Sequence, residues 1–357
     1  MKRPVVWVLV VVSVFALAAC ARSSLQVQWE AALDLANAEA DVAALDALAA
    51  SAPRQVDAAQ ARLDAARTLR DGGRLAAAAK RFMAIGDEAS RIADRARGRY
   101  ELARLAEDTG RETQAVSLYR SLVLTYPRLM PGERALQHLL RLARAAGPEA
   151  VGAHLRWTRG VFPRLAETSL GDNLIFQAAE VAAERFARTQ KAADWDLAVL
   201  LFQRVAREYP RGALWDDAHW ELSWLYHDRQ LYDAEINEIE TIRLRREAVS
   251  FFGQDEHPYF YVGQRRLARL SLVHLHDPIR ARDAWRSYAA TWTRSIYRDD
   301  AWFFAGCAAL LAGDEAGARA DFAAIVEHRP ESRFIRRTEA ALADPTGPHC
   351  MPPKEHR

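Results

Sequence analysis

Residues 299–330 read DDAWFFAGCAALLAGDEAGARADFAAIVEHRP, and this stretch indicates the fold of the chain. Ala, Leu, Arg and Glu, which favour helix, dominate it. Gly313 lies near its middle and predicts a turn between two helices. Small residues let those helices approach closely, large apolar residues fill the space between them, and a proline ends the second helix. The residues with these roles are Trp302, Gly306, Gly313, Ala318, Phe322 and Pro330.

The spacing of these residues resembles that of the tetratricopeptide repeat. When the unit is numbered from Asp299, Trp stands at place 4, Gly at places 8 and 15, Ala at place 20, Phe at place 24 and Pro at place 32. Two further copies carry residues at corresponding places. They are Ala103, Gly110, Ala115, Tyr119 and Pro127 in one copy, and Ala198, Phe202 and Pro210 in a partial copy.

Weaker copies surround these three and extend the array from about residue 59 to residue 332. A single hairpin cannot bury its own apolar face, whereas a stack of hairpins buries a continuous core. We therefore expect an all-α fold, an α-solenoid of about seven tetratricopeptide-like helical hairpins. The alternative is a helical bundle without repeats, in which the matching spacings arise by chance.

The first twenty residues indicate export and a lipid anchor. Lys2 and Arg3 precede an apolar run over residues 5–19, which is shorter than the roughly 20 residues of a membrane-spanning helix. The run ends in Leu-Ala-Ala before Cys20, which resembles the lipobox of bacterial lipoproteins. That resemblance implies acylation of Cys20, and Ala21 implies an outer-membrane destination. An ordinary secretion signal that contains a cysteine is the alternative.

Composition shifts and turn residues predict how the whole chain is organised. In chain order we expect a signal peptide (1–19), a lipidated N-terminus with a capping helix (20–58), a first arm of repeats (59–246), a connecting loop (247–262), a second arm (263–343) and a disordered tail (344–357). The segment after the signal peptide contains no run of apolar residues long enough for a transmembrane helix.

The charge balance argues against a nucleic-acid partner. The chain has 49 Lys and Arg residues against 47 Asp and Glu residues, a net charge of +2, whereas a nucleic-acid binder shows a basic excess on one face. The sequence contains no nucleophile elbow, phosphate-binding loop or His-Glu-x-x-His pair. We therefore expect no enzymatic activity, no cofactor and no metal site.

Two cysteines remain once Cys20 is assigned to the lipid anchor. An exported protein meets an oxidising compartment, where Cys307 and Cys350 are able to form a disulfide. The alternative is a buried free thiol at Cys307 and a frayed tail around Cys350. The sequence leaves both alternatives open.

The tetratricopeptide resemblance implies that the first helix of each hairpin lines the concave surface on which partners bind. A well-known variant of that family clamps a carboxylate with Lys, Asn and Arg at places 2, 5, 6 and 9. Here Phe303 and Cys307 stand at places 5 and 9, so that clamp is not supported.

Aromatic residues of the central region are the main candidates for a partner groove. Trp220 and Trp224 are four residues apart and share a helix face with His227, and tryptophan is enriched at binding hot spots. Core packing between repeats is the alternative. Tyr100 and Arg104 are candidates for a polar part of the groove, with a solvated face as the alternative. The full candidate set is Trp220, Trp224, His227, Tyr100, Arg104 and Phe303.

These features favour a non-enzymatic scaffold that is anchored to the outer membrane, faces the periplasm and binds envelope proteins. The chain resembles tetratricopeptide lipoproteins of outer-membrane barrel assembly and the repeat module of cell-division coordinators. The alternative is a superhelical module related to lytic transglycosylases that binds or regulates peptidoglycan hydrolysis without a catalytic domain, because residues 259–268 faintly resemble the late repeats of that family.

Overall fold

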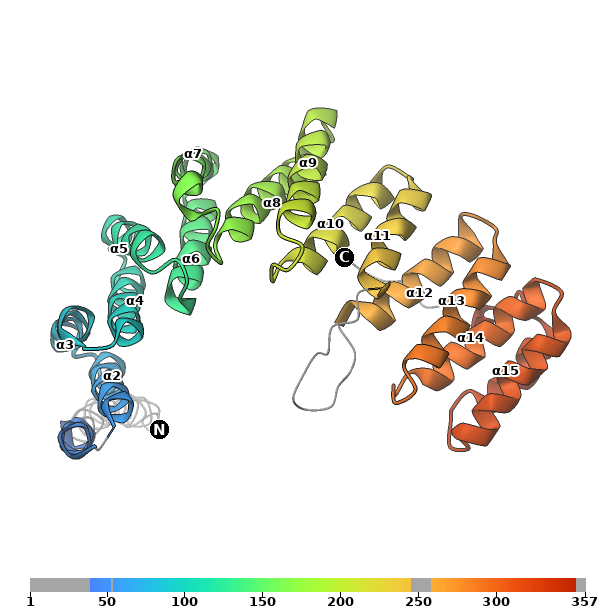
Figure 1. Cartoon of the computed structure of the whole chain (residues 1–357), viewed down its shortest axis with the longest axis horizontal. Coiled ribbons are helices and arrows are strands. Elements are labelled where there is room, and N and C mark those ends of the chain that lie inside the picture. The colour runs from blue at the N-terminus through green and yellow to red at the C-terminus, as the bar shows by residue number, and fades with distance from the viewer. Residues whose placement is uncertain (1–38, 53, 245–257, 351–357) are drawn as a thin grey trace, which may run out of the picture. The chain divides into compact units, whose positions relative to one another are not determined.

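The computed structural model describes residues 39–52, 54–244 and 258–350, and every regular element in these ranges is helical. The chain divides between Gly171 and Asp172 into two compact units. Helices α2 to α15 pair in chain order as seven hairpins (Figure 1). The predicted all-α solenoid of about seven hairpins is therefore confirmed.

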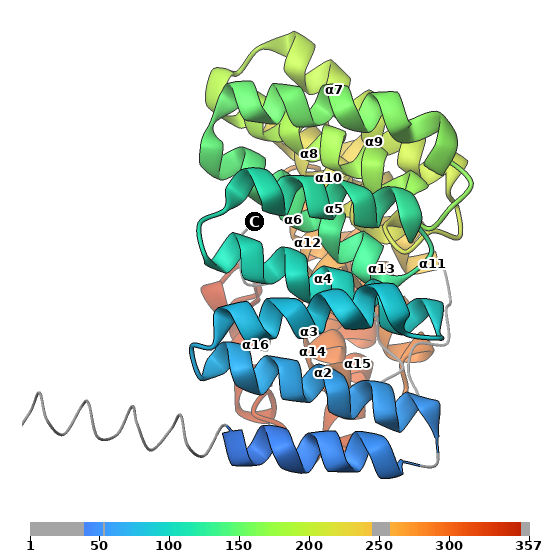
Figure 2. The ribbon, with the colours of Figure 1, turned by 90° about the vertical axis from the view of Figure 1, so that its left-hand side faces the viewer.

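The first unit contains three hairpins and the helical residues 39–51 that precede them. Its helices are α2 (Gln55–Asp71), α3 (Leu75–Glu88), α4 (Ile92–Asp108), α5 (Glu112–Thr125), α6 (Met130–Ala146) and α7 (Pro148–Leu165). Consecutive helices contact each other along this series, and Figure 2 shows residues 39–51 and the helices α2 to α5 stacked in chain order.

The second unit contains four hairpins, one further helix and a short 3₁₀ helix. These are α8 (Gly171–Thr189, which begins at the last residue of the first unit), α9 (Ala192–Glu208), α10 (Trp215–Asp228), α11 (Tyr232–Leu244), α12 (Pro258–Val273), α13 (Pro278–Thr291), α14 (Arg298–Leu311), α15 (Glu315–His328), α16 (Ile335–Ala343) and η1 (Pro348–Cys350). Over the described ranges, no helix combines the length and the apolar character needed to cross a membrane.

The turn that connects the two helices of each hairpin contains one residue with a positive φ angle. In four hairpins the residue is a glycine, namely Gly73, Gly110, Gly147 or Gly313. In the other three it is Gln190, Gln230 or His276, with φ between 52° and 58°. This left-handed conformation costs a residue with a side chain about 1 kcal/mol or more. Packing of the two helices must therefore hold these three turns in place.

The two helices of the last hairpin approach each other closely at Gly306. A Cβ atom at this position would lie only 2.4 Å from Cε1 of Phe322, so the ring of Phe322 occupies the space that any larger residue would need. Ala318, on the same helix as Phe322, is completely buried. Small and large residues thus have the complementary roles predicted from the sequence.

The same complementary pattern recurs in the other recognised copies. Alanines at place 20 and aromatic residues at place 24 are buried in each: Ala115 with Tyr119, Ala198 with Phe202, and Ala318 with Phe322. Ala103 is also fully buried, and Trp302 is almost so. Pro127, Pro210 and Pro330 each stand two residues beyond the end of the second helix of their hairpin.

Residues 39–51, the described helical part of the segment predicted to contain a capping helix, pack on the first hairpin. Val42 packs with Leu63 and Phe82 in one apolar cluster, and the guanidinium of Arg81 donates two hydrogen bonds of 2.7 Å to the carboxylate of Asp46. Residues 1–38, which include the signal peptide and Cys20, lie outside the described residues.

Two predicted boundaries are wrong. The connecting loop was expected to reach residue 262, but α12 begins at Pro258, where a proline suits the first turn of a helix. The loop was also expected to divide the array into two arms. Instead α11 and α12 pack against each other, and the division into units falls at Gly171.

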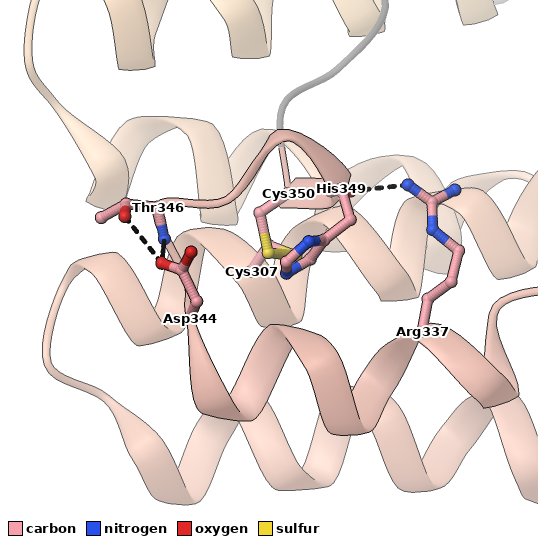
Figure 3. The surroundings of a disulfide bond; sticks show 6 residues. All are labelled: Cys307, Arg337, Asp344, Thr346, His349 and Cys350. Carbon is pink, nitrogen blue, oxygen red and sulfur yellow. Dashed lines mark hydrogen bonds between the residues drawn. A yellow bond between two sulfur atoms is a disulfide. The ribbon is translucent and has the colours of Figure 1, made fainter.

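The C-terminal segment 344–350 is ordered, which corrects the predicted disordered tail. Cys350 forms a disulfide with Cys307 of α14, with 5.4 Å between their Cα atoms, and both cysteines are buried. The carboxylate of Asp344 accepts hydrogen bonds from Thr346, and the guanidinium of Arg337 donates one of 2.8 Å to the carbonyl of His349 (Figure 3). The covalent link and these bonds offset the entropy of ordering a Pro- and Gly-rich segment. Residues 351–357 lie outside the described residues.

Candidate functional site

The predicted aromatic groove residues of α10 face α12, the first helix of the next hairpin. The guanidinium of Arg266 lies 3.5 Å from the centre of the Trp224 ring, and Trp224 is buried. The ring of Trp220 stacks on Tyr259, with 4.7 Å between ring centres. Trp224 therefore follows the alternative interpretation of packing between repeats, whereas Trp220 remains partly exposed.

Arg266, which contacts Trp224, forms a buried ion pair with Glu235. Arg266 donates a hydrogen bond of 2.6 Å to Glu235 and one of 3.0 Å to the hydroxyl of Ser223. His227 lies with its Nδ1 2.9 Å from the same glutamate. Glu235 is fully buried and Arg266 nearly so. The cluster joins α10, α11 and α12, and its charges are already matched within the chain.

Tyr100 takes part in a second network that joins α4 to α6. Its hydroxyl lies 3.0 Å from Nε2 of His138, and Nδ1 of His138 lies 2.8 Å from the carboxylate of Glu107. Because a carboxylate only accepts hydrogen bonds, the neutral imidazole carries its proton on Nδ1 and accepts from Tyr100. Tyr119 donates to the same carboxylate at 2.7 Å. Tyr100 is buried and therefore does not present a polar groove surface.

Burial controls the protonation of this network. It lowers the pKa of His138, and it raises the pKa of Tyr119, to which Glu107 adds. The pKa of Glu107 is lowered because bonds from Tyr119 and His138 outweigh its desolvation. Arg104 lies beside the network, 3.9 Å from Asp108, and its side chain is partly exposed, which fits both a polar groove and a solvated face.

Phe303 was predicted to line the partner groove, and this prediction is wrong. Its side chain is completely buried and stacks on Phe334 at 4.6 Å between ring centres. Phe334 immediately precedes α16, a helix that the repeat pattern did not predict. Because α16 packs onto α14, it covers the face on which Phe303 stands.

The structure reveals a different site in the second unit, an open pocket of about 600 Å³ that we call the Tyr261 pocket. Its wall is built from α12 and α14, the first helices of the last two hairpins, with Tyr297 just before α14. The two residues before α16, α16 itself and the disulfide-linked tail complete the wall. The polar residues that line it are Tyr261, Arg265, Tyr297, Asp300, Arg333 and Arg337. Phe304, Phe334 and Pro348 contribute apolar surface.

Tyr261 and Asp300 connect the walls of this pocket. The ring of Tyr261 stacks on Tyr297, with 3.7 Å between ring centres. Its hydroxyl donates a hydrogen bond of 2.8 Å to Asp300, and Arg333 donates to the same oxygen at 3.2 Å. Burial raises the pKa of Asp300, while the bonds from Tyr261 and Arg333 act in the opposite direction.

The arginines lie against aromatic rings. The guanidinium of Arg337 is 5.1 Å from the centre of the Phe334 ring, that of Arg333 is 4.8 Å from the same ring, and that of Arg265 is 5.5 Å from the Tyr261 ring. Burial and then the neighbouring charge of Arg333 lower the pKa of Arg337. Guanidinium groups nevertheless stay charged at neutral pH, so the pocket presents fixed positive charge.

This pocket suits binding. Three arginines and one aspartate line it, a composition that holds an anionic group by charge-assisted hydrogen bonds. Among the described residues, no group of three or more His, Cys, Asp or Glu side chains is placed to hold a metal ion.

Sequence reasoning missed the Tyr261 pocket for two identifiable reasons. Tyr261 fell inside the segment predicted to be a loop, and Arg265 fell just after it. Arg333 and Arg337 followed Pro330, where the recognised repeats ended. The four-residue spacing of these two arginines around Phe334 was the one available signal, because it places both on one side of a helical turn.

No family model matches the chain. No curated protein matches its sequence either. Among solved structures, it is similar to PilW, a widely conserved type IV pilus biogenesis factor, with 12% identity over 68% of this chain and 98% of PilW and a TM-score of 0.33. It is also similar to a tetratricopeptide repeat protein of Parabacteroides merdae ATCC 43184, with 13% identity over 80% and 99% of the two chains and a TM-score of 0.33.

A third similar structure is a kinesin light chain protein of Podosopora anserina with tetratricopeptide-like repeats. It shares 15% identity with this chain over 70% of this chain and 95% of its own, with a TM-score of 0.31. Paired helices, tight left-handed turns and buried small residues recur through the described residues. The chain is an α-solenoid of tetratricopeptide-type hairpins, a fold that suits a protein-interaction scaffold.

Proposed function

We propose that the protein is a lipid-anchored scaffold that faces the periplasm and binds partner proteins of the bacterial envelope. The observation that carries the proposal is the array of stacked hairpins, whose second unit has an open pocket lined by first helices. Solenoids of this kind present extended surfaces to partner chains. The lipobox-like end of the apolar run at Cys20 supports the anchor.

The disulfide supports a location outside the cytoplasm. Disulfides form and persist in oxidising compartments such as the bacterial periplasm and are rare in the cytosol. Cys307 and Cys350 are joined across the last hairpin and the tail. This agrees with export directed by the N-terminal segment, and an acylated Cys20 would then hold the chain at a membrane surface.

The anchor is tested by comparing wild type with Cys20→Ala. Wild-type protein should fractionate with the outer membrane, and its N-terminal peptide should carry the mass of acyl chains. Cys20→Ala should keep its signal peptide or be released without lipid. A wild-type chain whose mature N-terminus carries no lipid would contradict the proposed anchor. It would not contradict the proposal that the protein is a scaffold.

Partner binding is tested by photo-crosslinking in living cells. A benzoylphenylalanine at Tyr297, in the wall of the Tyr261 pocket, should capture one or a few envelope proteins. The matched control places the same probe at Val326, an exposed residue of α15 away from the pocket. Identical capture from both positions would contradict specific binding at the pocket. Clearing of peptidoglycan by the purified chain would overturn the non-enzymatic assignment.

A further inference from the structure

The Tyr261 pocket has the size and the opening of a ligand site. Its volume of about 600 Å³ lies within the range of roughly 300–1,000 Å³ that is usual for ligand pockets. Tyr297, in its wall, is partly exposed, and the side chain of Arg333 is largely exposed. An occupant can therefore reach both an aromatic surface and a cation from solution.

The charges that line the pocket are unbalanced. Among the described residues that line it, Asp300 is the one carboxylate beside the guanidinium groups of Arg333 and Arg337, and it already accepts hydrogen bonds from Tyr261 and Arg333. A guanidinium carries five N–H donors, and the bond from Arg337 to His349 uses one of them. An anion placed between Arg333 and Arg337 would reduce the repulsion between their two guanidinium groups, which adds to burial in lowering the pKa of Arg337.

The rings that line the pocket add a second kind of recognition. Tyr297 stacks on Tyr261, and the ring of Phe334 lies beside the guanidinium groups of Arg333 and Arg337. Aromatic side chains associate with such rings by stacking and with guanidinium groups through cation–π contact. The pocket thus offers cationic and aromatic contacts side by side.

We propose that the Tyr261 pocket binds an acidic peptide segment of a partner protein, in which a side-chain carboxylate stands next to an aromatic residue. This rests on the proposed function only in taking the partner to be a protein. A planar carboxylate matches the paired donors of a guanidinium, and the neighbouring aromatic residue matches the wall formed by Tyr261 and Tyr297. A nucleic acid fits poorly, because the chain as a whole carries almost no net positive charge.

The proposal is tested by isothermal titration calorimetry with the full mature chain in detergent, its disulfide intact. The probe is the capped peptide acetyl-Gly-Glu-Phe-Glu-Gly-amide, and the control peptide has both Glu residues replaced by Gln. We expect the acidic peptide to bind at least ten-fold more tightly. Equal affinities, or no binding of either peptide, would overturn the proposal.

Variants on one helical segment locate the site. Arg333→Gln and Arg337→Gln should each weaken binding of the acidic peptide about ten-fold, as expected when a charge-assisted hydrogen bond is lost. Arg336→Gln is the matched control, because Arg336 lies between them, is exposed and does not line the pocket. A loss of similar size with Arg336→Gln would show a diffuse charge effect and contradict the assigned site.

Two further titrations distinguish the class of ligand. If inorganic phosphate binds as tightly as the acidic peptide and with the same dependence on Arg333, the pocket is a phosphate site. If N-acetylphenylalanine matches the peptide, it is a small-molecule carboxylate site. Either result overturns the peptide proposal. Partner capture at Tyr297 without peptide binding would contradict the peptide proposal and leave the proposed function standing. Peptide binding without partner capture would support the peptide proposal and contradict the proposed function.

Discussion

At the scale of single residues, the close contact inside the last hairpin depends on the missing side chain of Gly306. Gly306→Ala should lower the free energy of unfolding by about 1–3 kcal/mol, because the ring of Phe322 must move away from the new methyl group. Urea denaturation followed by circular dichroism measures the change.

Gly160→Ala is the matched control for that substitution. Gly160 also lies inside a helix, but a Cβ atom there would meet nothing within 4 Å. Alanine should therefore raise stability by about 0.5–1 kcal/mol through its helix propensity alone. Effects of the same sign at the two glycines would contradict the steric explanation.

Residue identity predicted some roles better than others. The small and bulky residues of the hairpin, such as Gly306 and Phe322, were predictable because their partners lie in the same repeat at a fixed spacing. Phe303 and Trp224 were assigned to a groove because a sequence shows which face of a helix a residue occupies. It does not show which neighbouring helix covers that face, and α16 and α12 cover these two.

At the scale of elements, the contact between α4 and α6 should make the stability of the first unit depend on pH. Burial lowers the pKa of His138 below its unfolded value of 6.5, so the unfolded chain takes up the proton first as pH falls. The stability contributed by neutral His138 is therefore present above pH 6.5 and is lost as pH falls below that value.

His138→Gln should flatten this dependence between pH 7 and the folded pKa of His138. Unfolding of wild type and variant, measured at several pH values, gives the comparison. Glu107 acts in a separate and more acidic range, because its lowered pKa supplies stability that is lost only as pH falls below its unfolded pKa of 4.5. An unchanged slope near pH 6 in the variant would show that His138 is not the group responsible.

The disulfide should stabilise the second unit and leave the first unchanged. It closes a loop between residues 43 apart in sequence, for which a loss of about 2–4 kcal/mol on reduction is expected. Calorimetry with and without a reductant measures this loss, and Cys350→Ser should reproduce it without a reductant. Alkylation of two thiols in the untreated native chain would contradict the bond itself.

Helices and turns could be predicted from the sequence where they follow the spacing of the repeat. Tight turns at Gly110 and Gly313 followed from glycine, whereas the turns at Gln190 and His276 carried no such signal. The tail was predicted to be disordered because it contains several prolines and a glycine. The disulfide, which the sequence left open, orders residues 344–350 together with the hydrogen bonds of Asp344 and Arg337.

At the scale of the whole molecule, stacked hairpins should respond locally to damage. Glu101 is buried and accepts hydrogen bonds from Arg67 and Arg70 of the preceding hairpin. Glu101→Ala leaves these two cations without their shared acceptor. Because each repeat contacts only its neighbours, hydrogen exchange should accelerate in α2 to α5 and stay unchanged in α12 to α15. Faster exchange throughout the chain would show a single cooperative core instead.

The bond between Cys307 and Cys350 also has a consequence for how the protein matures. Pro348 belongs to the wall of the Tyr261 pocket and stands two residues before the bonded Cys350. A chain in a reducing compartment would lack the bond that fixes this wall, so the pocket would be completed only once the two cysteines are oxidised. Protein produced in the cytoplasm of a host cell would then be an immature form, and its failure to bind a ligand would reflect the open thiols rather than the finished pocket.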